Sequence, residues 1–314
     1  MAIAALAGIG GCDAGRTGDG GAVGLEPAPR IDLANAPAKL PSITPAPETD
    51  VILLDPGESP RRPLRYRPAL GDEQKLTVIA TMDLALDTDG HRMFGRTLEN
   101  RLVVRFRVEA ISDRGDIDVS FEIVESEQTN IAPGSPAGGL QSLEGASGSF
   151  VADDRGGILA SDLAALAERG IAGAFFVLSN YIVELPEEPI GQGARWEIQS
   201  SQSQQGMTVP IVESLQLVEL DGDRGRVRGE ITHANQPQIM TSAELAPDSV
   251  MEVISSESAG ETAAAFSRAR LISPRTLSYE SNASMQLRTP GLEQDVTMVT
   301  SVTTRIDDEY VRAR

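Results

Sequence analysis

Apolar and polar side chains alternate along most of the chain after Pro63. Three runs have apolar residues at every second position, and they lie at Leu76–Ala80, Val104–Val108 and Ile117–Ile123. A period of two residues is typical of antiparallel strands that bury one face and leave the other in water. The segment Asp113–Asp116, between the second and third runs, supplies the Asp and Gly residues that a tight hairpin turn needs. The pattern predicts a mainly β protein with antiparallel strands.

The same layout returns later in the chain. Val212–Leu220 and Val227–Thr232 alternate in the same way, and a turn at Asp221–Gly225 separates them. The tripeptide Asp-Arg-Gly occurs in both predicted turns, at 113–115 and at 223–225. We expect an internal duplication, with a first β half over residues 64–186 and a second over residues 187–314. The related halves would form a curved sheet or half-barrel, either as one continuous sheet or as two lobes.

One segment, from about residue 161 to 185, interrupts the β pattern. Ser161 can cap an α-helix there, and Pro186 follows its expected end. Apolar residues recur at helical spacing, and five of them form a candidate apolar ligand face: Leu163, Leu166, Ile171, Phe175 and Leu178. We expect this helix to cover one open face of the sheet, and the alternative is a movable lid over an apolar cavity.

The N-terminal residues resemble a secretion signal. A short apolar run ends in Ile9-Gly10-Gly11-Cys12, which resembles the bacterial lipobox, in which the Cys becomes the acylated N-terminus after cleavage. We therefore expect residues 1–12 to be a signal peptide with its lipobox, and Cys12 to be the lipid attachment site. A signal peptide begins with positive charge, yet no Lys or Arg precedes Arg16, so we expect the start codon to lie upstream. The alternative is an ordinary thiol in a tail.

Residues 13–63 are rich in proline and glycine and show no sustained hydrophobic period. This composition predicts a disordered linker that would hold the folded part away from the membrane. Within it, Val51–Leu54 is a candidate for pairing with another part of the chain.

Composition and charge exclude several classes of function. The 314 residues are 40% hydrophobic, which is enough to build a core, and the net charge of −19 repels nucleic acid. A single Cys excludes an intrachain disulfide and a cysteine zinc site, and two His leave little material for a metal site. No glycine-rich phosphate loop or nucleophile turn is present, and neither His91 nor His233 has a recognisable catalytic partner. We expect no enzyme activity, no metal and no cofactor.

Four short stretches carry a wider resemblance. They are 64–72, 154–156, 185–196 and 220–225, and the stretch from Leu185 to Trp196 is the most specific. On these residues the chain from about Leu64 to Asp307 resembles a family of uncharacterised proteobacterial lipoproteins, best represented in myxobacteria. No activity is established for that family, so the resemblance implies no catalytic residue. The β pattern is also similar to the open half-barrels of lipoprotein carriers and of mycobacterial lipid-binding lipoproteins, which implies lipid binding by analogy of fold.

These observations predict a lipoprotein of the cell envelope, facing the periplasm and held by an N-terminal acyl anchor in the inner or the outer membrane. Its function would be to bind a lipid or another apolar ligand on the curved sheet. The alternative is a structural or interaction lipoprotein with a filled core and a protein or polymer partner.

Overall fold

The computed structural model describes residues 44–45, 49–88, 91–130, 142–163, 166, 181–204, 207–235, 237–240, 250–289 and 292–308. Over these residues the protein is mainly β and its strand pairs are antiparallel, which confirms the predicted fold class. Of the predicted site residues, Cys12, Ile171, Phe175 and Leu178 lie outside the described residues.

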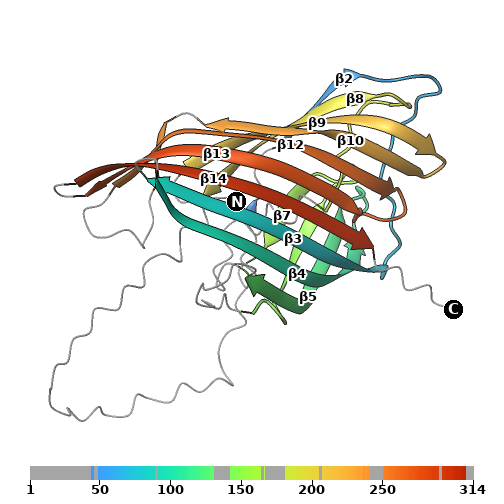
Figure 1. Ribbon diagram of the computed structural model, residues 1–314. Coiled ribbons are helices and arrows are strands. Elements are labelled where there is room, and N and C mark those ends of the chain that lie inside the picture. The colour runs from blue at the N-terminus through green and yellow to red at the C-terminus, as the bar shows by residue number, and fades with distance from the viewer. Residues whose placement is uncertain are drawn as a thin grey trace, which may run out of the picture.

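All the described strands belong to one sheet (Figure 1). They are β1 (Thr44–Pro45), β2 (Thr49–Asp55), β3 (Glu73–Thr88), β4 (His91–Ile111), β5 (Ile117–Asn130), β6 (Ser147–Ala152), β7 (Ile158–Asp162), β8 (Arg195–Gln204), β9 (Met207–Asp221), β10 (Arg224–Asn235), β11 (Gln238–Met240), β12 (Val250–Ser267), β13 (Arg275–Thr289) and β14 (Leu292–Asp308). Their order in space is β1-β7-β6-β5-β4-β3-β14-β13-β12-β10-β9-β8-β2, and β11 also pairs with β12. Because β14 pairs with β3, the strands of residues 64–186 and those of residues 187–314 form one continuous sheet.

The C-terminal part of the expected linker belongs to the fold. Thr49–Asp55 forms β2, which pairs with β8 at one edge of the sheet, and the expected pairing of Val51–Leu54 is thereby confirmed. Val51 and Leu53 pack against the core. The expectation of a disordered linker up to residue 63 is therefore wrong at Thr44–Pro45, which form β1, and from Thr49 onward, where alternating aliphatic residues outweigh the surrounding prolines.

The sheet is strongly curled. β1 pairs with β7 at one end of the strand order, and β2 pairs with β8 at the other end. Only residues 46–48 separate Pro45 from Thr49, and four fully extended residue steps reach about 14 Å. The two edges of the sheet therefore come within about 14 Å of each other at this point, and the sheet encloses a concave interior (Figure 1).

Two connecting segments fill one end of this interior, which we call the packed end. Residues 56–72 cross it and hydrogen-bond in turn to three other parts of the chain: Arg62 pairs with Ile190, the Tyr66 amide donates to the Asp154 carbonyl, and the Arg67 amide donates to the Arg268 carbonyl. Residues 181–194 form the second segment. The largest fully buried side chains of the protein gather here, and they include Trp196, Tyr66, Phe106 and Phe150.

The helix expected at about 161–185 does not reach either of its described ends, although Leu166, a described residue between them, is helical. Ser161, its expected cap, is a residue of β7 and pairs with Phe150 of β6. Tyr181 to Leu185 contain no helix, because their side chains are fixed in the core: the Tyr181 ring packs edge-on against Phe106 at 5.5 Å between centroids. The intervening residues 164–165 and 167–180 lie outside the described part.

Candidate functional site

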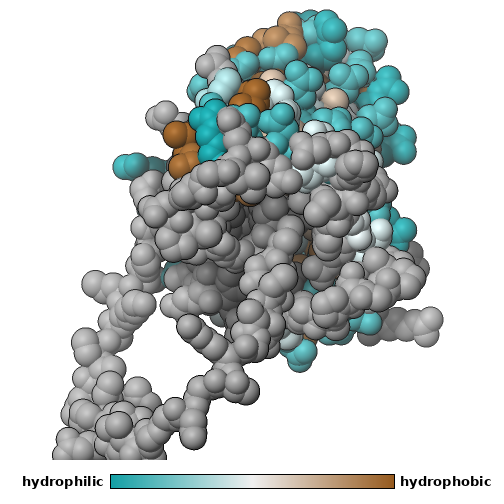
Figure 2. Space-filling model, turned by 60° about the vertical axis from the view of Figure 1, so that its left-hand side comes forward, coloured by the Kyte–Doolittle hydropathy of each residue, from teal (hydrophilic) through white to brown (hydrophobic). Residues whose placement is uncertain are grey.

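The end of the interior opposite the packed end is rich in methionine. The protein has eight methionines, and four whose side chains the structure describes are buried or half-buried in strands, in the part of each strand away from the packed end: Met82, Met251, Met285 and Met298. We call this region of the sheet the methionine end. Figure 2 views the molecule from this side.

Pairing between the strands makes the inner face of the methionine end continuous. Met285 of β13 lies between Val253 of β12 and Val296 of β14, and all three side chains are buried. Met298 of β14, also buried, lies next to Ala283 of β13. Methionine side chains are unbranched and polarisable, so they adapt to apolar surfaces of different shape. This inner face can accommodate an apolar molecule by changing rotamers.

A second apolar cluster lies between the methionine end and the packed end. It consists of Ile211, Ile231, Leu277, Tyr279 and Val302, with Met82 and Val209 packed against it. It spans β9, β10, β13, β14 and β3, so the apolar surface extends across the concave face of the sheet. Burial raises the pKa of the Tyr279 hydroxyl above its ordinary value.

Four polar side chains cross this apolar surface in a row. His233 of β10 pairs with Ser258 of β12, Ser258 with Ser281 of β13, and Ser281 with Thr300 of β14. Ser258 Oγ and His233 Nε2 share a hydrogen bond of 2.9 Å. Burial lowers the pKa of His233 to about 4, so its imidazole is neutral at neutral pH. We call these four residues the polar row.

A buried ion pair lies between the polar row and the packed end. The Arg275 guanidinium contacts the Glu213 carboxylate, and its Nε donates to Thr262 Oγ1 at 2.9 Å. Both charged side chains are largely buried. Because the two charges compensate each other, the pair leaves no free charge for a ligand.

A buried carboxyl group marks the packed end. Burial, with a smaller contribution from the nearby Asp153 carboxylate, raises the pKa of Glu184 to about 7, and Arg155 opposes this shift. The backbone carbonyl of Glu184 accepts the Trp196 indole N–H at 3.0 Å. Asp153 accepts hydrogen bonds from the backbone amides of Arg155 and Gly157 at 2.9 and 2.8 Å. The Asp153 hydrogen bonds close the turn of residues 153–157, and the Trp196 hydrogen bond joins β8 to the second connecting segment, so these contacts fix the structure of the packed end.

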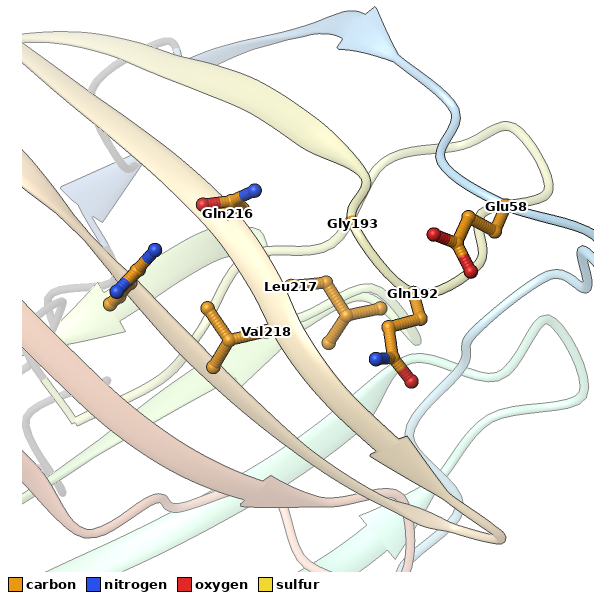
Figure 3. A pocket seen from close by; sticks show the side chains of 7 residues that line it. Glu58, Gln192, Gly193, Gln216, Leu217 and Val218 are labelled. Carbon is orange, nitrogen blue, oxygen red and sulfur yellow. The ribbon is translucent and has the colours of Figure 1, made fainter.

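A shallow hollow of about 290 Å³ lies beside the loop that precedes β8 (Figure 3). Its lining residues are Glu58, Gln192, Gly193, Gln216, Leu217, Val218 and Arg228. The lining mixes apolar groups with polar ones, including one acidic and one basic side chain, so it does not form a continuous apolar surface for an apolar ligand.

The outer surface of the methionine end also carries apolar side chains. Ile239, Val250 and Ile254 of β11 and β12 are exposed. Figure 2 shows hydrophobic residues at the surface on this side of the molecule. Exposed aliphatic residues beside an apolar interior are typical of a place where an apolar molecule enters.

The residues predicted from the sequence occupy a different place. Leu163 is partly buried against the core and Leu166 is buried within it, so neither presents a free ligand face. His233 is a member of the polar row. Sequence reasoning missed the methionine end, although the methionines themselves were visible in strands with period-two alternation. In the described part of the chain, no cluster of three or more His, Cys, Asp or Glu is placed to hold a metal ion.

Comparison with known proteins shows little similarity. No protein-family model and no curated protein matches the chain. A solved structure that is similar to it is that of Pseudomonas aeruginosa OpdQ, with 5% sequence identity, 77% of this chain and 100% of OpdQ covered, and a TM-score of 0.22. A likeness at that score carries no argument about function. Within the described residues, no helix is long and apolar enough to span a bilayer.

Proposed function

We propose that this protein is a membrane-anchored lipoprotein of the cell envelope that binds a lipid or another apolar molecule on the inner face of its methionine end. The observation that carries the proposal is the different lining of the two ends of the interior. Aromatic side chains and two crossing segments fill the packed end, whereas methionine and small aliphatic side chains line the other end.

The N-terminal sequence supports the anchor. Acylation of Cys12 would place fatty chains at the mature N-terminus, each stabilised in the bilayer by about 0.8 kcal/mol per buried CH₂. The residues after Cys12 would form a tether to the sheet, which starts at β1. The net charge of −19 would keep the folded part away from an anionic lipid surface.

The alternative is an interaction protein, and the edge strand β2 favours it. Ile52 and Leu54 of β2 are exposed, at 41% and 54% of their surface. An edge strand with exposed aliphatic side chains can add a strand from a partner. In this case the concave interior would hold no ligand.

Protein purified from its own host tests the proposal. We expect native mass spectrometry and lipid extraction to find a bound apolar molecule, and mass analysis to find an acylated Cys12. Changing Met285 and Met298 together to glutamine would reduce the bound lipid about tenfold or more, because two apolar contacts are replaced by polar ones.

The matched control is Ile111→Gln, since Ile111 is exposed and lies in β4 at the packed end. We expect this variant to keep its lipid. A ligand-free host protein would contradict lipid binding, and a co-purified protein displaced by charge at Ile52 would favour the interaction protein instead.

A further inference from the structure

The polar row crosses the middle of the apolar surface. Its three steps between neighbouring strands, at about 4.8 Å each, give a length of about 14 Å. On one side the row is flanked by Ile231, Tyr279 and Val302, two residues away along β10, β13 and β14. On the other side lie Ala283 and Met298, both buried, and the buried Ser256 of β12, which pairs with Ala283. The row is therefore a hydrogen-bonding band within a mainly apolar surface.

Thr300 is the unexplained member of this row. Its side chain is fully buried, and among the described residues Oγ1 has no hydrogen-bond partner. Leaving a buried hydroxyl unpaired costs free energy, and valine has the same shape without that cost. The fold alone therefore gives no reason for threonine here, whereas a ligand that pairs with the hydroxyl does.

The row offers hydrogen bonds but no charge. Serine and threonine hydroxyls both donate and accept, and the imidazole of His233 is desolvated and hydrogen-bonded to Ser258. The Arg275–Glu213 pair nearby is compensated within the protein. A charged headgroup buried at the row would lose its hydration and gain no opposite charge from these four side chains.

We propose that the polar row binds the uncharged head of a neutral glyceride. Thr300 Oγ1 makes the main hydrogen bond to this head, and the acyl chain lies over the methionine end. The inference rests on the proposed lipid binding and adds the class of lipid to it. A glyceride head carries hydroxyl and ester oxygens, which match the donors and acceptors of the row.

Binding of three probes to the full chain tests this inference. The probes are 1-monooleoylglycerol, oleate and the hydrocarbon 1-octadecene, each presented in the same detergent at pH 7.5. We expect Thr300→Val to weaken the binding of 1-monooleoylglycerol about five- to tenfold, which is the usual effect of losing one buried hydrogen bond. The affinity for 1-octadecene should not change.

The control is Thr303→Val, because Thr303 lies on the same strand and its side chain is exposed. We expect it to bind all three probes as the unchanged protein does. Thermal unfolding without ligand supplies a second readout: Thr300→Val should unfold at the same or a higher temperature, since it removes an unpaired hydroxyl.

The outcomes separate the two proposals. If Thr300→Val weakens the binding of 1-monooleoylglycerol and of 1-octadecene equally, the role of the polar row is overturned, whereas the proposed lipid binding stays intact. Tighter binding of oleate than of 1-monooleoylglycerol would also overturn that role. If the unchanged protein binds none of the three probes, the proposed function fails as well.

Discussion

The two ends of the concave interior are built from the same strands but packed by different means. At the packed end, rigid aromatic rings meet crossing segments whose backbone groups are hydrogen-bonded, as where the Tyr66 hydroxyl donates to the Val183 carbonyl at 2.8 Å. At the methionine end, the buried side chains are flexible methionines, small aliphatics and a band of hydroxyls. One sheet thus combines a fixed base with an adaptable surface, and the difference lies in which side chains point inward.

The largest expected effect tests this difference in packing directly. Trp196 is completely buried, and its indole N–H is paired with the Glu184 carbonyl. We expect Trp196→Ala to lower the free energy of unfolding by about 4 kcal/mol, because it leaves a large cavity. A volume-conserving change at the methionine end, Met285→Leu, should lower the free energy of unfolding by less than about 1.5 kcal/mol.

Denaturant unfolding of both variants measures these costs. A third variant, Trp196→Phe, keeps an aromatic ring and separates the loss of volume from the loss of the hydrogen bond. If Met285→Leu destabilises the protein as much as Trp196→Ala, the methionine end is as tightly packed as the other end and the comparison fails.

The pH dependence of stability is the next largest effect. The pKa of Glu184 in the folded protein is raised from 4.5 to about 7, so the folded state holds this proton more tightly than the unfolded state does. Its contribution to stability is complete below about pH 4.5 and is lost as the pH rises toward 7. The loss amounts to at most about 3 kcal/mol.

Glu184→Gln isolates this contribution from those of the other acidic groups. We expect the free energy of unfolding of the variant, minus that of the unchanged protein, to increase between pH 4.5 and 7 and to stay level above pH 7. A constant difference across this range would show that the Glu184 carboxyl is not buried as described.

A pair of glycines gives the smallest effect and sharpens the description of the packed end. Gly156 and Gly71 both have positive φ, at 93° and 81°. A Cβ at Gly156 would lie 2.6 Å from Ile182 Cγ2, whereas a Cβ at Gly71 would meet nothing within 4 Å. We expect Gly71→Ala to lower the free energy of unfolding by about 1 kcal/mol through backbone strain alone, and Gly156→Ala to lower it by about 2 kcal/mol or more. Thermal unfolding compares the two variants. Equal decreases in their unfolding temperatures would mean that the packed end can rearrange around Ile182.

Local pattern predicted much of the fold. The alternation at Val104–Val108 and Ile117–Ile123 gave β4 and β5, and the predicted hairpin turn lies between them with Gly115 at φ 91°. The second predicted turn, at Asp221–Gly225, connects β9 and β10. These strands and turns depend on residues that are close together in the sequence, so the sequence of one segment is enough to predict them.

The errors arose where distant contacts decide the structure. Ser161 fits a helix cap and a strand equally well by residue type, and its pairing with Phe150 decides between them. The candidate site depends on the pairing of β14 with β3, which joins residues about two hundred positions apart. The relatedness of the two β halves remains a prediction.

The short crossing from β1 to β2 has a mechanical consequence. Pro45 lies at one margin of the curled sheet and Thr49 at the other, so the connection of three residues between them limits how far the two margins can separate. A pull from the N-terminal side acts first on β1 and its pairing with β7, and then on this connection. Such tension would load the two margins of the sheet before it reached the strands that line the interior.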